Sequence, residues 1–168
     1  MDWLLKPRNA NIMGALICAG LMGFALYAQH GLGLAPCPLC VFQRVAVIAL
    51  GVIFALAALH APRGAGRIVY GLLALAAAAG GAGVAGRHAW LQSLPPDQVP
   101  ACGPGLDFMM DTFGLGEVLS MVLSGSGECA DVAWSFFGLS MPLWVLLWCV
   151  SLGIFAAWAN WRRPAVEG

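Results

Sequence analysis

Charged residues are scarce in this chain of 168 residues: Asp, Glu, Lys and Arg together make up 10% of it, whereas 61% is hydrophobic. Soluble domains carry roughly 25% charged residues, so this composition excludes an ordinary water-soluble globule. Net charge is missing as well, because eight basic residues balance eight acidic ones. High hydrophobicity with zero net charge excludes a disordered chain, and it leaves no electrostatic footprint for a nucleic-acid partner. The class that remains is a small, single-domain integral membrane protein.

Long hydrophobic runs are present in the number and length that membrane helices require. A bilayer core about 30 Å thick needs about 20 apolar residues per helix. The third run is almost wholly Ala, Gly and Leu, a composition that lets helix backbones approach closely in lipid. We therefore expect an all-α integral membrane protein, a four-transmembrane-helix bundle. Its spans are predicted at 11–28, 41–60, 68–85 and 141–159, and its outer loops at 29–40 and 86–139.

The two sides of the predicted bundle differ in charge. Because Lys and Arg are enriched in cytoplasmic loops, both termini are predicted to be cytoplasmic and the two loops to lie outside the cytoplasm. Six of the eight acidic residues lie in the long outer loop. The first span could also be a signal peptide, but no suitable small-residue cleavage site follows it, so we expect it to be retained. Six of the eight basic residues mark the cytoplasmic side: Lys6, Arg8, Arg63, Arg67, Arg162 and Arg163.

The long outer loop is too interrupted to be a fifth span. Prolines break its first part, at positions 95, 96, 100 and 104. Further along, apolar residues recur at helical spacing: Leu115, Val118, Leu119 and Val122. This pattern predicts a short helix that lies in the membrane interface or packs on the bundle.

The six cysteines divide into two groups. Cys18 and Cys149 lie within spans, where cysteine is usually a small buried apolar residue. The other four lie in the outer loops, where thiols meet oxidising conditions. One structural disulfide per loop is the simplest interpretation of these four: Cys37, Cys40, Cys102 and Cys129.

Three features of the first pair favour redox chemistry instead. A Cys-x-x-Cys disulfide closes too small a loop to constrain the unfolded chain much. Pro36 and Pro38 suit the start of a helix, which would place Cys40 near the positive helix end, where a thiolate is stabilised. Arg44 follows one turn later on the same face and can stabilise negative charge on sulfur or on a bound acceptor. An arginine here can also snorkel to the lipid headgroups, but the neighbouring dithiol favours a functional role.

A metal or haem centre is not expected. Structural zinc sites usually present two closely spaced pairs of ligands, and only one cysteine pair is close in this sequence. Cys40 is followed by Val41 rather than by His, so the signature of c-type haem attachment is missing.

The order of these features closely resembles the family of disulfide bond formation protein B (DsbB), quinone-linked membrane oxidases that regenerate a soluble thiol oxidase, DsbA. The resemblance covers residues 11–161. Pro-Leu inside the first pair and Gln43 before Arg44 depart from the family's usual pattern, and neither changes the expected reaction type. The matching stretches are Gln29-His30, Pro36-Cys37-Pro38-Leu39-Cys40, Arg44, His88, Leu91-Gln92, Cys102, Gly127-Glu128-Cys129-Ala130, Trp134, Phe137-Gly138-Leu139 and Met141-Pro142-Leu143-Trp144.

The resemblance implies a relay of two disulfides, Cys37–Cys40 and Cys102–Cys129. A reduced, periplasmic DsbA-like dithiol would attack Cys102, and the freed Cys129 would form a transient Cys37–Cys129 disulfide. Cys40 would then pass the electrons to a quinone of the membrane pool, ubiquinone or menaquinone.

The resemblance also implies further roles and a location. Arg44, His88 and Cys40 would bind the quinone, with His88 a candidate proton donor. Taken alone, His88 would be an interfacial histidine hydrogen-bonded to a loop. The implied location is the bacterial inner membrane, with the active cysteines on the periplasmic side and neither metal nor nucleic acid bound.

Two other interpretations use the same cysteines. Vitamin K epoxide reductase is also a four-span bundle with a Cys-x-x-Cys pair, but in that family the active pair follows the loop cysteines, whereas Cys37 and Cys40 precede them. The other is a non-enzymatic membrane protein whose two loop disulfides brace the fold. Braces would resist a reduced thioredoxin-like partner, whereas a relay would exchange with it quickly.

Overall fold

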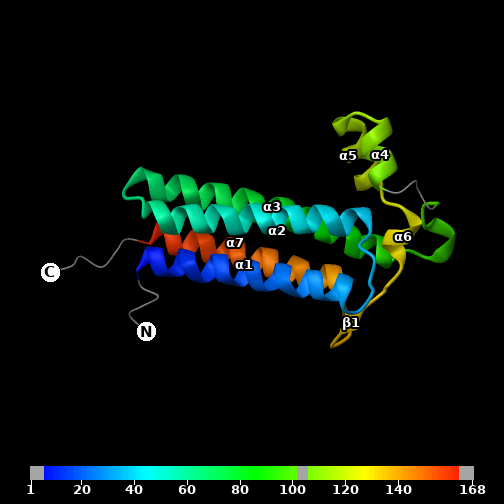
Figure 1. The fold of residues 1–168 in the computed structure, drawn as a ribbon, viewed down its shortest axis with the longest axis horizontal. Coiled ribbons are helices and arrows are strands. Elements are labelled where there is room, and N and C mark those ends of the chain that lie inside the picture. Colours follow the sequence, from blue (N-terminus) through cyan, green and yellow to red (C-terminus); the bar gives the residue numbers. More distant parts are fainter. Residues whose placement is uncertain (1–5, 102–105, 163–168) are drawn as a thin grey trace.

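The computed structural model describes residues 6–101 and 106–162, and it contains four long helices with a folded segment at one end (Figure 1). These helices run side by side, and each is long and apolar enough to cross a membrane. They are α1 (Pro7–His30), α2 (Pro38–His60), α3 (Ala65–Gln92) and α7 (Met141–Trp161). The predicted all-α bundle of four membrane helices is confirmed.

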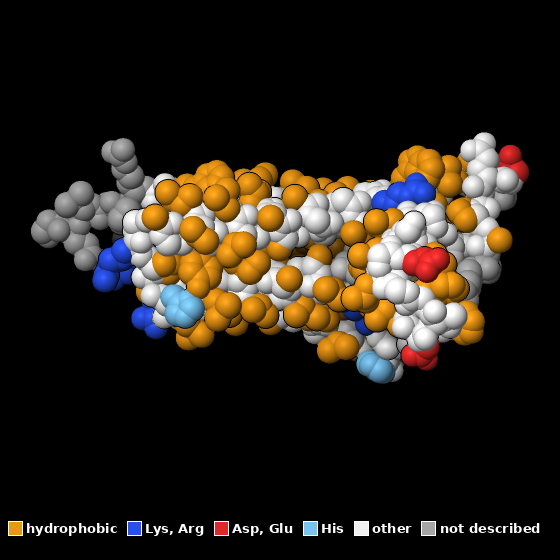
Figure 2. Space-filling model, turned by 90° about the horizontal axis from the view of Figure 1, so that it is seen from above, with side chains coloured by type: hydrophobic (Ala, Val, Ile, Leu, Met, Phe, Trp, Pro, Cys, Tyr) orange, Lys and Arg blue, Asp and Glu red, His pale blue; other side chains and the backbone are white. Residues whose placement is uncertain are grey.

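The bundle has two unlike ends. α1 begins and α7 ends at one of them, which we call the terminal end; the segment between α3 and α7 lies at the other, the loop end (Figure 1). Figure 2 shows hydrophobic side chains along the length of the bundle, and the acidic side chains seen on this face lie at the loop end. Of the six basic residues that mark the predicted cytoplasmic side, Arg163 lies outside the described residues.

Proline and the polar ends of the apolar runs determine where the helices begin and end. α1, α2 and α7 each have Pro in the first turn, where its missing N–H costs no helical hydrogen bond. α3 is 28 residues long and continues beyond the apolar run predicted at 68–85. His88 therefore lies on a helix, within the segment that the sequence assigned to the outer loop.

The segment between α3 and α7 contains only short elements. α5 (Leu115–Ser124) confirms the helix predicted from the apolar spacing, with Val118 and Val122 buried and Leu119 half exposed. A two-residue turn at Phe137 and Gly138, both with positive φ, closes an antiparallel hairpin of two strands. The remaining elements are η2 (Pro96–Gln98), α4 (Leu106–Thr112), α6 (Gly127–Ala130), β1 (Ser135–Phe136) and β2 (Leu139–Ser140).

The buried side chains form two apolar cores. The first fills the bundle with residues of all four long helices, among them Cys18, Leu50, Phe54, Ala78, Cys149 and Leu152. The second lies at the loop end and joins α2, α3, α4, α5 and α6 through Leu39, Leu91, Met109, Val118, Val122 and Cys129. The second core therefore holds the loop cysteine against the start of α2.

A pair of asparagines connects α1 to α7 at the terminal end. Asn11 and Asn160 are buried, and each amide donates a hydrogen bond of 3.2 Å to the side-chain oxygen of the other. Their remaining amide hydrogens are donated to the carbonyl oxygens of Pro7 and Ala156. All four amide N–H groups are thus paired, as a buried polar pair in lipid requires.

Candidate functional site

The described outer cysteines come together at the loop end. The Cys37 and Cys40 sulfurs at the start of α2 are 3.2 Å apart. The Cys37 sulfur, the Cys129 sulfur of α6 and a ring nitrogen of His88 all lie within 4.8 Å of one another. These three cysteines are free thiols in this structure, and Cys102 lies outside the described residues. The predicted disulfide pairings therefore stay predictions.

The start of α2 sets the geometry of the first cysteine pair. Cys37 is the N-cap residue, and its sulfur accepts a hydrogen bond of 3.4 Å from the backbone N–H of Cys40. Pro38 occupies the first turn, so Cys40 follows with its sulfur beside that of Cys37. Cys40 therefore lies at the positive, N-terminal end of α2, as the sequence predicts.

Cys129 reaches the first pair because the chain turns sharply before α6. Gly125 has φ +87°, and a Cβ there would lie 2.4 Å from the side chain of Leu91 on α3. Arg87 of α3 donates hydrogen bonds to the last carbonyls of α5, Leu123 (2.9 Å) and Ser124 (3.0 Å). Both features draw the α5–α6 junction onto α3, beside the start of α2.

The environment of Cys129 keeps this thiol protonated in the reduced protein. The pKa of Cys129 is raised above its ordinary value by the interaction with the Cys37 sulfur and by burial. The hydroxyl of Ser126, 3.6 Å from the Cys129 sulfur, acts in the opposite direction. At neutral pH, Cys129 therefore carries its proton.

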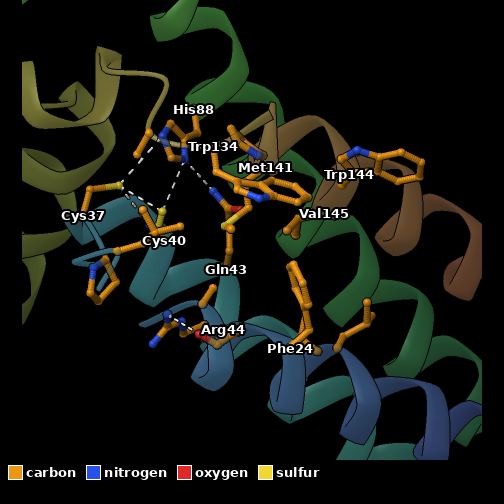
Figure 3. Close-up of a pocket in the computed structure, with 18 of the residues that line it drawn as sticks. Phe24, Cys37, Cys40, Gln43, Arg44, His88, Trp134, Met141, Trp144 and Val145 are labelled. Carbon is orange, nitrogen blue, oxygen red and sulfur yellow. Dashed lines mark hydrogen bonds between the residues drawn. The ribbon is translucent and has the colours of Figure 1, made fainter. Parts of the chain in front are cut away.

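His88 of α3 faces both cysteines of the first pair (Figure 3). Its Nε2 lies 3.8 Å from the Cys37 sulfur, and its Nδ1 lies 4.0 Å from the Cys40 sulfur. The same Nδ1 lies 2.8 Å from the amide nitrogen of Gln43, and both side chains are buried. Sequence reasoning treated Gln43 only as a departure from a pattern. Its spacing of three residues from Cys40, which puts both on one helical face, was the available signal.

Arg44 is directed at α1. Its guanidinium donates one hydrogen bond to the side-chain oxygen of Gln29 and another, of 3.1 Å, to the carbonyl of Ala25. Among the described residues these are its hydrogen-bond partners, so Arg44 connects α2 to the loop end of α1. It lines the same cavity as Cys40.

This cavity of about 350 Å³ lies between α1 and α7 and is bounded by the start of α2 and the chain before and within the hairpin (Figure 3). Trp134 contacts Phe24 of α1 and stacks on Phe136, whose carbonyl accepts a hydrogen bond from the ring N–H of Trp144 on α7. Its walls are otherwise largely apolar. The polar side chains that line it are Gln43, Arg44, His88, Glu128 and Asp131, together with the thiols of Cys37, Cys40 and Cys149.

The cavity suits a largely apolar organic molecule with a few polar atoms. Its volume lies in the range of small-molecule sites, and such sites combine apolar walls with a small number of placed polar groups. Cys40, Arg44 and His88, the three residues predicted to bind a quinone, all line it. Thiols and imidazoles are also ligand types that soft metal ions take; the absence of a metal here stays a prediction.

Comparison with known proteins agrees with this arrangement. The family model described as "Disulfide bond formation protein DsbB" matches residues 7–159. A relative from Nitrosococcus oceani, named "Disulfide bond formation protein B", is 52% identical over 164 residues, which cover 98% of this chain and 97% of the relative. Proteins of the same name from Hahella chejuensis and Xanthomonas axonopodis pv. citri are 51% and 50% identical, and the matches cover at least 95% of each chain. Four membrane helices, clustered outer cysteines and these matches together place the chain in the DsbB family of membrane proteins for disulfide bond formation.

Proposed function

We propose that this protein reoxidises a soluble, DsbA-like dithiol oxidase and transfers the electrons to a membrane quinone. The observation that carries the proposal is the position of the cysteines. Cys129, from a distant loop, lies beside Cys37 at an apolar cavity that Cys40 lines. A pair of structural braces would not require the two loops to bring their sulfurs together, whereas a relay does.

The first half of the relay moves the partner's electrons inward. A thiolate of the partner attacks Cys102, breaks the Cys102–Cys129 disulfide and releases Cys129 as a thiolate. Cys129 attacks Cys37, which forms the Cys37–Cys129 disulfide and releases Cys40 as a thiolate. The proximity of the Cys37 and Cys129 sulfurs supports this step.

The second half restores the loop disulfide. The partner's second thiolate attacks the partner sulfur that is bound to Cys102. The partner leaves as a disulfide, and Cys102 is released as a thiolate. Cys102 then attacks Cys129, re-forms Cys102–Cys129 and releases Cys37. The net result is an oxidised partner and a reduced Cys37/Cys40 pair.

The cavity residues supply the surroundings in which that pair is oxidised again. A bound quinone supplies the acceptor for two electrons and two protons. The apolar walls exclude water near Cys40, and the guanidinium of Arg44, held by Gln29 and Ala25, presents positive charge at the cavity wall. His88, buried beside both sulfurs, is placed to exchange a proton at a ring nitrogen.

We further propose that the loop end faces the periplasm of a bacterial inner membrane, with both termini in the cytoplasm. The concentration of acidic residues in the long loop and of basic residues near the termini supports this orientation. The partner is a soluble periplasmic protein, so the relay requires the outer cysteines on that side.

The test is a coupled assay with the complete protein in lipid nanodiscs. Reduced DsbA-like protein is mixed with a short-chain ubiquinone, and quinone absorbance and partner thiols are followed together. We expect one quinone to be consumed per dithiol oxidised. Cys40→Ser should abolish quinone consumption, and a rate equal to that of the unaltered protein would overturn the mechanism.

Cys18→Ala is the matched control, because it removes a cysteine that lies in the bundle core, away from the relay. It should keep the rate of the unaltered protein. Replacing ubiquinone by a menaquinone analogue in the same assay tells which of the two predicted quinones the cavity accepts.

A further inference from the structure

The hydrogen bond between Gln43 and His88 fixes where the neutral imidazole carries its proton. The amide nitrogen of Gln43 lies 2.8 Å from Nδ1 of His88. With the amide nitrogen of Gln43 turned toward Nδ1, as in this structure, Gln43 donates and Nδ1 accepts, so that Nδ1 carries no proton of its own. In the neutral ring the single N–H is then on Nε2.

The protonated nitrogen faces a sulfur of the relay. Nε2 lies 3.8 Å from the Cys37 sulfur, whereas Nδ1 is on the side of Gln43 and Cys40 (Figure 3). His88 is 2% exposed and Gln43 is 4% exposed, so water does not compete for either side chain. Because hydrogen bonds to a charged acceptor are stronger in such surroundings, an N–H at this position selectively stabilises a thiolate on Cys37.

We infer that Gln43 is a positioning residue that holds His88 in the Nε2–H tautomer, so that His88 donates a hydrogen bond to Cys37 whenever Cys37 leaves as a thiolate. Gln43 acts on the cysteine through the imidazole and not by direct contact. This assigns His88 to the thiol relay, in addition to the quinone side on which the sequence resemblance placed it.

The step that benefits is the release of Cys37 from the Cys37–Cys129 disulfide. The Cys102 thiolate attacks the Cys129 sulfur, a Cys102–Cys129 bond forms, and the electron pair of the broken bond stays on Cys37. The Nε2–H group donates a hydrogen bond to that sulfur, and its proton stays on the ring. A better stabilised leaving thiolate departs faster. This assignment of a step rests on the proposed function, whereas the tautomer does not.

The tautomer is measured by nitrogen NMR of the complete protein, labelled with ¹⁵N-histidine and incorporated in nanodiscs. The ¹⁵N shift of a ring nitrogen tells whether it bears a proton. His88 is assigned by comparison with His30→Gln and His60→Gln variants. We expect Nε2 protonated and Nδ1 unprotonated at neutral pH, and a proton on Nδ1 in the unaltered protein would overturn the inference.

Two substitutions of Gln43 make the prediction specific. Gln43→Leu removes the donor, so His88 should show a mixture of tautomers. Gln43→Glu places an acceptor at Nδ1, so the proton should move to Nδ1. Gln92→Leu removes a glutamine of α3, one turn beyond His88, that is hydrogen-bonded to Asp131, and it should leave the His88 tautomer unchanged. An unaltered tautomer in both Gln43 variants would contradict the assigned role.

The kinetic arm follows the Cys37–Cys129 disulfide during turnover, by acid quenching and peptide mapping. Slower release of Cys37 should increase the steady-state amount of the Cys37–Cys129 disulfide several-fold in Gln43→Glu, with no loss of thermal stability. If the tautomer moves but this disulfide does not accumulate, the assignment to Cys37 release is wrong. If the unaltered protein never forms the disulfide, the relay of the proposed function is wrong, and the NMR result alone decides the role of Gln43.

Discussion

At the scale of single residues, the protonation of the Cys129 thiol depends on its immediate neighbours. Cys129 is 1% exposed and lies between the Cys37 sulfur and the hydroxyl of Ser126. The first neighbour and burial raise the pKa of Cys129, and the second opposes them. The thiolate is the form that attacks, so the reactivity of Cys129 depends on pH through this balance.

In the fully reduced protein, we expect the rate of Cys129 alkylation to keep rising with pH up to values well above the pKa of an ordinary thiol. Below a raised pKa the thiolate fraction is small, so the rate should rise about tenfold per pH unit through the neutral range. The measurement is iodoacetamide labelling with peptide mass spectrometry at a series of pH values. Ser126→Ala removes the opposing hydrogen bond and should slow labelling further, and a rate that levels off near neutral pH would contradict the raised pKa.

A second prediction concerns Arg44, whose guanidinium contacts Gln29 and Ala25 at once. Arg44→Lys keeps the charge but has no planar fork for both acceptors, so we expect the KM for quinone to rise while the protein still folds. Arg44→Ala should weaken quinone use further, by about tenfold or more. Steady-state kinetics at varied quinone concentration, with the amount of folded protein measured in parallel, give both values. If Arg44→Ala instead fails to accumulate in the membrane, a role in anchoring the helix is favoured.

Some of these residues could be predicted from the sequence and others could not. Cys37, Cys40 and Arg44 could be singled out because the Cys-x-x-Cys motif and the helical spacing are local patterns, whereas the roles given to Cys102 and Cys129 rested on the family resemblance. The contact of Gln43 with His88 could not, because it joins residues 45 positions apart on two helices. The closeness of Cys129 to Cys37 followed only from the family resemblance, since no local rule relates two loops.

At the scale of elements, the α5–α6 turn determines whether the loop cysteine reaches the bundle. Gly125 has φ +87° and ψ 157°, a conformation that only glycine adopts readily. It packs directly on Leu91, and Arg87 holds the preceding helix end. The position and orientation of α6 therefore depend on the backbone conformation of Gly125.

Gly125→Ala should displace α6 and separate Cys129 from Cys37. The added Cβ would meet Leu91 at 2.4 Å in a backbone conformation that alanine avoids, so the turn must change. We expect diamide to form the Cys37–Cys129 disulfide at least tenfold more slowly in a Cys40→Ser, Cys102→Ser background. Gly116→Ala is the matched control, since no atom lies near its Cβ position and it is helical. Equal rates in the two variants would show that the turn does not position Cys129.

The long helices could be predicted from the sequence, whereas their ends and the hairpin could not. The four long helices followed from apolar runs, because the bilayer requires about 20 such residues. Their ends did not follow, since α3 continues through polar residues up to Gln92. The hairpin was missed because two-residue strands give no alternating pattern, and positive φ at Phe137 is unusual for a bulky residue.

For the whole molecule, the asparagine pair is a buried polar connection between the first and last helices. Asn11→Leu leaves Asn160 buried with an unsatisfied oxygen and N–H, so it should destabilise the bundle by about 1–3 kcal/mol. The double variant with Asn160→Leu should cost less than the sum of the two single ones, with a coupling energy of about 0.6–1.7 kcal/mol. Unfolding in mixed micelles gives these values, and strictly additive single effects would show that the pair does not act as a unit.

Because the asparagine pair lies near one end of α1, a small rotation of this helix about the pair would displace its other end. Asn11 and Ala28, which lines the cavity, are 17 residues apart on one helix, a length of about 25 Å. A rotation of α1 by about 5° around the asparagines would therefore move its outer end by about 2 Å. Arg44 holds that outer end through Gln29 and Ala25. α1 is thus held to α7 by the asparagine pair at the terminal end and to α2 by Arg44 near the loop end.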